Sequence, residues 1–123
     1  MVSPTLAPIS PNPTLSDLKM FYTCADIFVY PSTYEGFGIP LLEAMACGVP
    51  VVTNRKGSIL EVAGDAAIYF DGDSKEALQE KIFDVMKNSK LRDLLIAKGY
   101  ENLSRYSWNS SVKKLSAIYT SLV

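Results

Sequence analysis

Three short apolar runs recur along the middle of this chain, and they constrain its fold more than any other feature. They are rich in branched and aromatic residues and cover 26–30, 50–53 and 67–70. Pro31 stops the first run and a turn at 71–74 ends the last, as is typical of buried strands of a parallel sheet. Helical periodicity follows each run. This alternation indicates an α/β fold with crossover helices.

The predicted helices carry recognisable start and stop signals. Thr14 and Asp17 have the spacing of a capping box, which marks the first helix start. Pro40 and Gly48 bracket a second helix, since proline favours a first turn and glycine follows a last one. The helices are expected at 15–24, 39–46, 58–63, from near Asp73 or Ser74, around Leu91–Leu95, and after Ser107 with the apolar face Val112, Leu115, Tyr119 and Leu122.

The domain organisation predicted from these elements is an incomplete one. Residues 1–13 hold four prolines without an apolar period, which predicts an extended or disordered leader. Residues 14–123 then form a partial Rossmann-like domain of about three parallel strands, flanking helices and a helical C-terminus. Three strands buried on both faces make a thin sheet with two open edges. We therefore expect the C-terminal half of a larger domain.

Composition excludes several function classes. The chain has no histidine, which removes histidine bases, Ser-His or Cys-His pairs and nearly all zinc sites. Cys24 and Cys47 stand in apolar contexts, which predicts buried free thiols. Twelve Lys and Arg against thirteen Asp and Glu leave a net charge of −1, without the basic excess of a nucleic-acid binder. With no apolar stretch near the roughly 20 residues of a membrane span and no signal-peptide pattern, we expect a cytoplasmic protein.

The loop after the first strand combines several features of a ligand site. In an open α/β sheet, ligands bind at the carboxyl ends of the strands. Gly36 and Gly38 allow a sharp turn and close approach to the backbone, and the next helix directs free N–H groups at the same space, which suits a diphosphate. Glu35 and Glu43 bracket this site, and carboxylates suit vicinal hydroxyls. Together these features predict a binding site for a nucleotide-sugar.

Each of these residues also has a structural interpretation. A Gly-x-Gly in such a loop is often plain turn chemistry. Glu43 could serve only the helix dipole in the first turn, and Glu35 could be a solvated loop residue. The eight-residue spacing of the two acids around both glycines favours the functional interpretation.

The segment Glu35-Gly-Phe-Gly-Ile-Pro-Leu-Leu-Glu43 resembles the Glu-x7-Glu motif of retaining group-one glycosyltransferases with the GT-B fold. Three flanking segments resemble the same family in order and spacing, and the match covers roughly residues 15–123. The flanking segments are Ala25-Asp-Ile-Phe-Val-Tyr-Pro-Ser32, Glu43-Ala-Met-Ala-Cys-Gly-Val-Pro-Val-Val52 and Glu61-Val-Ala-Gly-Asp65.

The resemblance implies a role for each residue of the motif. Glu43 would hold the ribose hydroxyls of the nucleotide, and Glu35 would contact the donor sugar as the catalytic residue. Gly36, Phe37, Gly38 and Ile39 would lie beside the sugar and diphosphate. The family transfers a sugar with retention and without an essential metal, so we expect no cofactor. The donor would be UDP-, GDP- or ADP-linked.

The sequence also departs from the family. Residues 1–14 do not match the Gly-rich loop with its Arg and Lys, and the N-terminal acceptor domain is missing. We therefore expect half a donor site that is not active alone, in an enzyme that could be peripheral to the membrane. Arg55 and Lys56 either approach the donor or are exposed loop charges. Two alternatives stay open: a non-catalytic half-domain that pairs with a partner or itself through a sheet edge, and a simple mononucleotide or phosphosugar binder.

Two further patterns are interpreted as structural. Asp71-Gly-Asp73 resembles the Asp-x-Asp of metal-dependent glycosyltransferases of another fold, but a turn followed by a helix cap explains it. Aromatic residues near the C-terminus could form a sugar platform, although core or interdomain packing is the expected role. These aromatic residues are Tyr100, Tyr106, Trp108 and Tyr119.

Overall fold

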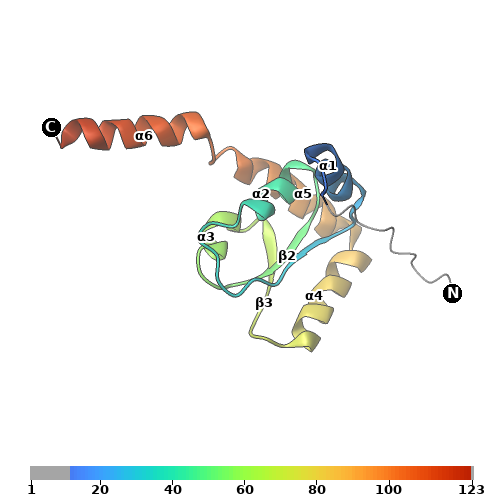
Figure 1. Ribbon diagram of the computed structural model, residues 1–123. Helices are drawn as coiled ribbons and strands as arrows, with labels where there is room; N and C mark the ends of the chain where they lie inside the picture. The colour runs from blue at the N-terminus through green and yellow to red at the C-terminus, as the bar shows by residue number, and fades with distance from the viewer. Residues whose placement is uncertain (1–11, 123) are drawn as a thin grey trace.

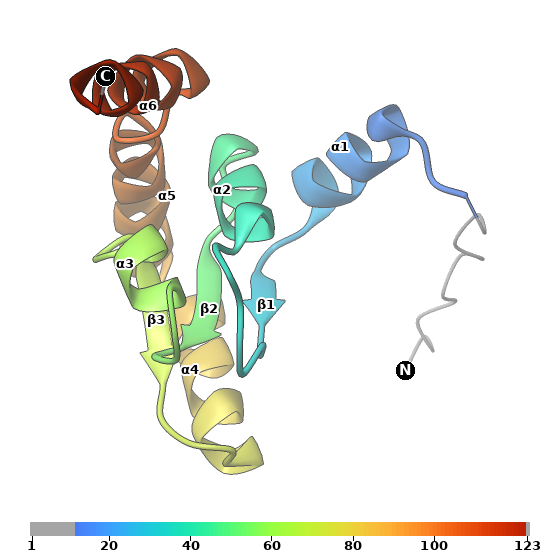
Figure 2. The ribbon, with the colours of Figure 1, turned by 60° about the vertical axis from the view of Figure 1, so that its left-hand side comes forward.

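The computed structural model describes residues 12–122, which form a three-stranded parallel sheet with helices on both faces (Figures 1 and 2). The predicted leader, 1–13, falls almost entirely outside the described residues. The elements are α1 (Leu15–Cys24), β1 (Phe28–Tyr30), α2 (Ile39–Ala46), β2 (Val51–Asn54), α3 (Ile59–Ala63), β3 (Ala67–Phe70), α4 (Lys75–Lys87), α5 (Ser89–Leu103) and α6 (Trp108–Ser121). The predicted fold class and element order are confirmed.

The strand order is β1-β2-β3, and every pairing is parallel. Phe28, Val51 and Ala67, the first residues of the three strands, share one register row, and the strands run parallel, so their carboxyl ends all lie at the lower rim of the sheet in Figure 2. The loops that precede α2 and α3 therefore lie at the same end. This end is where an open α/β sheet binds its ligands.

Alternating side chains of the strands feed two apolar clusters. Val51 contributes to a core under α1, α2 and α3, whereas its neighbour Val52 packs under α4 and α5. Helix α5 also reaches α2, because Gly99 leaves room for Met45: a Cβ at Gly99 would lie 3.2 Å from the Met45 Cγ. β2 is buried at every residue, as expected for the central strand.

Two expectations about the first strand are wrong. β1 begins at Phe28 rather than Asp26, and its three residues are half-buried instead of buried. The reason is its position: β1 is an edge strand, and only β2 pairs with it among residues 12–122. The second strand is shifted by one residue, from 50–53 to Val51–Asn54.

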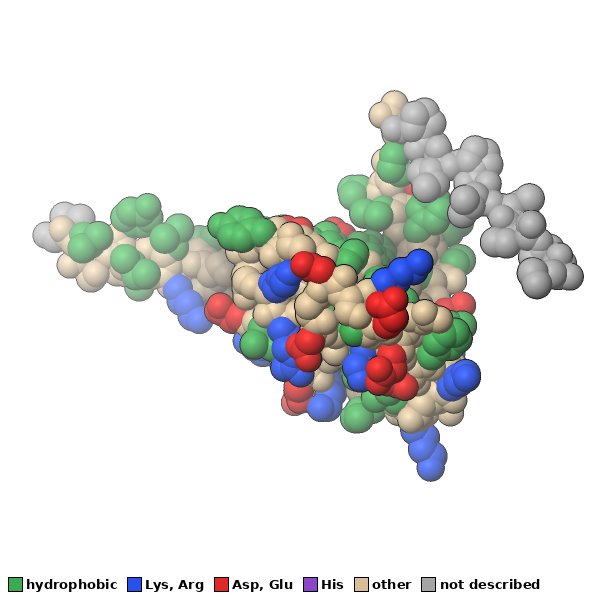
Figure 3. Space-filling view, turned by 90° about the horizontal axis from the view of Figure 1, so that it is seen from below, with side chains coloured by type: hydrophobic (Ala, Val, Ile, Leu, Met, Phe, Trp, Pro, Cys, Tyr) green, Lys and Arg blue, Asp and Glu red, His purple; other side chains and the backbone are tan. Residues whose placement is uncertain are grey.

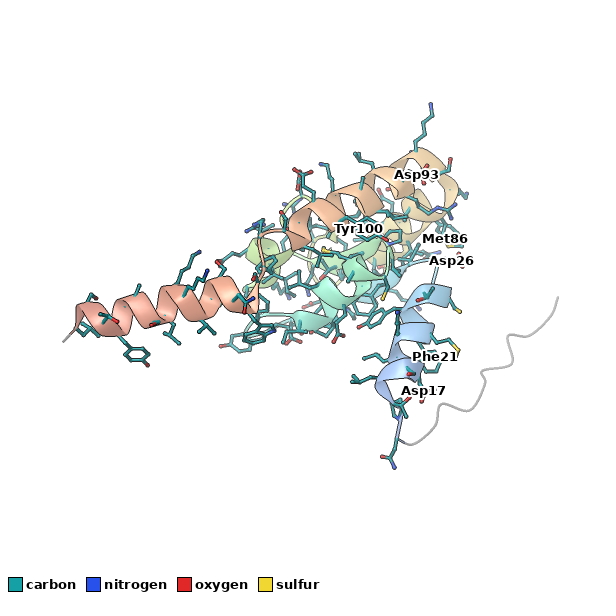
Figure 4. The ribbon with its side chains drawn as sticks, turned by 90° about the horizontal axis from the view of Figure 1, so that it is seen from above. Asp17, Phe21, Asp26, Met86, Asp93 and Tyr100 are labelled. Atoms are coloured by element: carbon teal, nitrogen blue, oxygen red, sulfur yellow. The ribbon has the colours of Figure 1, made fainter. Side chains whose placement is uncertain are left out.

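The helices at the two ends project from the body (Figures 1 and 4). α1 starts with the predicted capping box, in which Thr14 and Asp17 bond each other's backbone N–H. Its last residue, Cys24, is exposed, and Cys47 is half-buried, so the expectation of two buried thiols is wrong. Tyr22 is the buried residue of α1, while Phe21, labelled in Figure 4, is exposed.

Helix α6 has no buried residue among those described. Its Ser107 N-cap is as predicted, but its apolar face, which includes Val112, Leu115, Tyr119 and Leu122, is exposed, and Trp108 is 84% exposed. The prediction that Trp108 and Tyr119 pack in the core of this chain is therefore wrong, because α6 extends away from the sheet. Interdomain packing stays a prediction. Tyr100, labelled in Figure 4, is also exposed. No helix in residues 12–122 combines the length and apolarity needed to span a membrane.

Candidate functional site

The predicted site residues lie in the loop between β1 and α2 and in the first two turns of α2 (Figure 2). Glu35, Gly36 and Phe37 are in the loop, Gly38 caps α2, and Ile39 begins it. The loop starts at the carboxyl end of β1, as expected. Residues 35–39 are therefore adjacent at the rim of the sheet, and Glu43 follows from the second turn of the helix.

Of the two glycines in the loop, only Gly38 is required by the conformation of the backbone. Gly38 has φ +96°, in the left-handed region that favours glycine, and a Cβ there would lie 3.1 Å from the Leu41 Cδ1. Gly36 has no positive φ, and the space where its Cβ would stand is open. Gly36 therefore leaves room at the surface of the loop, which suits close approach of a ligand rather than a tight turn.

Glu43 is held by a tyrosine from α1. The Tyr22 hydroxyl donates a hydrogen bond to the Glu43 Oε2 at 2.9 Å. Tyr22 is 8% exposed, and burial together with the carboxylate raises its pKa above the ordinary tyrosine value. Within residues 12–122 no ion pair and no hydrogen bond other than that from Tyr22 engages the carboxylate of the half-buried Glu43. Its Oε1 can therefore accept a hydrogen bond from a ligand.

The helix-dipole interpretation of Glu43 is wrong as stated. The first turn of α2 contains no acidic residue, because Glu43 belongs to the second turn. The dipole effect falls off within the first turn. The first turn is instead apolar, with proline in it, so the positive end of α2 has no protein carboxylate in that turn to neutralise it.

Glu35 has two hydroxyl partners. Hydrogen bonds from Tyr30 and then Ser32 hold the pKa of the Glu35 carboxyl below its usual 4.5, and the Ser32 Oγ lies 2.7 Å from its Oε1. Burial, with the Glu35 contact as the next cause, raises the pKa of Tyr30 to about 12. Glu35 is thus ionised at neutral pH and acts as a hydrogen-bond acceptor.

An aromatic row connects the partners of the two acids. The Tyr22 and Phe28 rings meet edge to face at 5.3 Å, and Phe28 stacks on Tyr30 at 5.8 Å. All three side chains belong to the apolar cluster on the α2 side of the sheet. The tyrosine next to Glu43 thus comes from α1 and the one next to Glu35 from β1, and neither acid forms an ion pair within the described part of the chain.

Two residues that the sequence did not single out brace the loop. Asn54, 2% exposed at the end of β2, donates from its Nδ2 to the Ser32 carbonyl and accepts from the Lys56 N–H at 3.1 Å. Ser58 donates to the Glu35 carbonyl at 2.8 Å and stands 3.3 Å from that of Phe37. The available signal was a polar residue at the end of a buried strand and another in the loop that follows, because both positions lie at the binding rim of the sheet.

A third contact reaches the loop from the C-terminal part of the chain. The rings of Phe37 and Tyr106 meet edge to face at 5.6 Å. Tyr106 is half-buried between α5 and α6, and its hydroxyl donates to the Val62 carbonyl at 3.0 Å. Of the aromatic residues predicted to pack, Tyr106 therefore packs against the core and touches the site loop.

The charged residues after β2 and β3 pair with each other. Arg55 lies 3.4 Å from Asp71 and Lys56 lies 3.0 Å from Asp73. Figure 3 shows acidic and basic side chains interspersed on the lower face rather than segregated by sign. Asp71 and Asp73 thus face cations at the turn before the Ser74 cap of α4. Residues 12–122 hold no group of three or more His, Cys, Asp or Glu side chains that could bind a metal.

Comparisons with known proteins agree on one family. Residues 11–102 match the family model described as "Glycosyl transferases group 1". The chain is 42% identical over 94 residues to O-antigen chain mannosyltransferase B of Escherichia coli, covering 76% of this chain and 25% of that protein. It is 30% identical over 116 residues to D-inositol 3-phosphate glycosyltransferase of Corynebacterium urealyticum, covering 93% and 27%.

A solved structure gives the same result. Sucrose-phosphate synthase from Thermosynechococcus elongatus superposes with a TM-score of 0.74 at 26% identity, covering 83% of this chain and 26% of that chain. The chain thus spans about a quarter of the length of these matched proteins.

Proposed function

This chain belongs to the group 1 family of glycosyl transferases, and we propose that it is the donor-binding portion of a retaining enzyme that transfers a sugar from a nucleotide-sugar to an acceptor. The observation that carries the proposal is the pair of acids, Glu35 before the α2 N-terminus and Glu43 in the second turn of α2, each held by a hydroxyl of this chain. Two carboxylates that flank an anion site suit the hydroxyls on both sides of a diphosphate.

In this proposal each part of the site has one task. Glu43 accepts hydrogen bonds from the ribose hydroxyls through its free Oε1. Glu35, ionised and steadied by two hydroxyl donors, contacts the donor sugar as the catalytic residue. The backbone of 36–39 lies beside the diphosphate, and the N-terminal end of α2 favours the negative charge that develops as the diphosphate leaves. This electrostatic stabilisation replaces a metal ion.

The remainder of the enzyme is proposed to come from outside this chain. We infer a hexosyltransferase, since relatives are named as mannosyltransferase and glycosyltransferase. The part of the longer relatives that this chain does not span would bind the acceptor and would supply the Arg and Lys that neutralise the diphosphate. The chain alone is therefore not expected to catalyse sugar transfer. The nucleotide can be UDP, GDP or ADP, and the enzyme is proposed to be cytoplasmic.

Chemical-shift perturbation of the ¹⁵N-labelled chain with UDP-glucose, GDP-mannose and ADP-glucose tests the proposal. We expect one donor to perturb the amides of 35–43. Glu43→Gln should weaken both that donor and its free nucleotide about tenfold or more, since a charge-assisted hydrogen bond is lost. Glu35→Gln should weaken only the donor. The control is Glu101→Gln, an exposed acid of α5. Absence of perturbation with all three donors would refute the proposal.

The exposed edge of the sheet favours a second candidate, a half-domain that pairs with a partner or with a second copy. β1 pairs on one side only within residues 12–122 and is half-buried, and a strand edge offers unpaired N–H and C=O groups. Sedimentation equilibrium distinguishes this candidate. A dimer that forms without donor would support it, and a monomer over the whole concentration range would count against it.

A further inference from the structure

Each acid of the site is influenced by a tyrosine hydroxyl, and the two tyrosines belong to one aromatic row. Tyr22 donates to the Glu43 Oε2 at 2.9 Å. At the other acid, the Ser32 Oγ lies 2.7 Å from the Glu35 Oε1, and the Tyr30 hydroxyl holds the pKa of the Glu35 carboxyl below its usual value. We propose that Tyr22 and Tyr30 are positioning residues, which orient Glu43 and Glu35 for a nucleotide-sugar from the two ends of the row Tyr22–Phe28–Tyr30. The inference rests on the proposed function, because it names what orients the acids of that site.

The row is suited to hold the acids because it belongs to the packed part of the molecule. Tyr22 is buried, and its ring meets Phe28 at 5.3 Å with an interplanar angle of 62°. Phe28 stacks on Tyr30 at 5.8 Å and 23°. Phe28 and Tyr30 are held by their backbone pairing to β2. The two hydroxyls therefore keep a defined separation, which the loop carrying Glu35 does not provide by itself.

The contact leaves each carboxylate able to bind a ligand. A carboxylate has about four acceptor sites on two oxygens, and Tyr22 uses one of them on Glu43. On Glu35 the Ser32 hydroxyl uses one acceptor site at Oε1, and Tyr30 is the first cause of the lowered pKa of the carboxyl. Fixing a glutamate rotamer before binding removes part of the ordering cost that a ligand otherwise has to offset. A free carboxylate edge on a fixed side chain is what recognition of two neighbouring hydroxyls requires.

The two tyrosines should therefore have separable effects. Tyr22→Phe loses the hydroxyl at the Glu43 end, so it should weaken the free nucleotide and the nucleotide-sugar alike. Tyr30→Phe loses the hydroxyl at the Glu35 end, so it should weaken the nucleotide-sugar and leave the free nucleotide unchanged. In each case about five- to tenfold is expected, the effect of one hydrogen bond to a charged group.

Tyr69→Phe is the matched control. Tyr69 lies on the same register row as Tyr30, and its hydroxyl donates to the Gly64 carbonyl at 2.6 Å rather than to an acid. Burial raises its pKa to about 12, as for Tyr30. Loss of this hydroxyl should change unfolding stability without changing either affinity.

The experiment titrates the chain and its three Tyr→Phe variants with GDP, GDP-mannose, UDP, UDP-glucose, ADP and ADP-glucose by NMR. The predicted split between Tyr22→Phe and Tyr30→Phe supports the proposal. If both variants bind as Tyr69→Phe does, or lose both ligands equally, the proposal is overturned. If the unmodified chain binds none of the six compounds, the proposed function fails and this inference fails with it.

A second readout needs no ligand. The ¹³C carboxyl resonances of the glutamates report their titration directly. Tyr30→Phe should move the Glu35 midpoint upward, because it removes the first cause of its low pKa, whereas Tyr22→Phe and Tyr69→Phe should leave it in place. An unmoved midpoint in Tyr30→Phe would show that the hydroxyl does not hold Glu35, whether or not a donor binds.

Discussion

Substitution of Asn54 should destabilise this chain more than any exposed asparagine does. Asn54 is 2% exposed, and its amide satisfies two backbone groups, the Ser32 carbonyl and the Lys56 N–H. Asn54→Ala leaves both without that partner. A buried unsatisfied group costs about 1–3 kcal/mol, and water can reach part of this rim, so we expect a loss of about 2–4 kcal/mol. This loss is a large part of the free energy of unfolding of a domain, which is roughly 5–15 kcal/mol.

Urea unfolding followed by circular dichroism measures this loss as a shift in midpoint at constant slope. Asn88→Ala is the matched control, because Asn88 caps α5 from an exposed position and accepts a single bond from the Leu91 N–H at 3.0 Å. That cap is worth about 1 kcal/mol. If Asn54→Ala costs no more than Asn88→Ala, the argument that Asn54 braces the loop is refuted.

Three further predictions concern other parts of the chain. Glu35 should titrate below 4.5 in a ¹³C carboxyl experiment; since its folded-state pKa is depressed, its ionised form adds stability above that pH, and the contribution is lost as the pH falls through the folded pKa. Cys24, exposed at the end of α1, should react with a thiol reagent well before the half-buried Cys47 does, and equal rates would contradict the structure. Gly48→Ala should lower the free energy of unfolding in urea by about 1–3 kcal/mol. The reason is that Gly48 has φ +70° and that the new Cβ would stand 2.6 Å from the Tyr100 hydroxyl. An unchanged midpoint of urea unfolding would refute this.

Elements with local signals were predictable from the sequence. The bounds 39–46 and 67–70 match α2 and β3, and the capping box at Thr14 forms as expected. These signals act over a few residues, so they do not depend on how the segment packs against the rest of the chain. β1 starts two residues late because a partner decides its length: Phe28 is the first residue with a register partner, and its N–H bonds the Pro50 carbonyl at 2.9 Å.

Burial at the ends of the chain was not predictable from the same patterns. The apolar stripe of α6 indicates which face requires cover, but not whether this chain supplies the cover. Trp108 and Tyr119 are exposed for that reason. Cys24 is a similar case: its apolar neighbours suggested a core position, whereas the buried face of α1 is at Tyr22. Periodicity describes one element, and burial is a relation between two.

The same distinction applies to the candidate site. The spacing of Glu35 and Glu43 predicts that both lie at one end of the sheet, because a strand, a loop and a helix follow in order. Spacing does not say where a carboxylate points. That direction depends on hydroxyls such as those of Tyr22 and Tyr30. In the sequence these two tyrosines stand among apolar residues and resemble ordinary core aromatics. Two glutamates eight residues apart are therefore weak evidence in an arbitrary sequence, and they become specific only where a neighbouring strand and helix supply the groups that aim them.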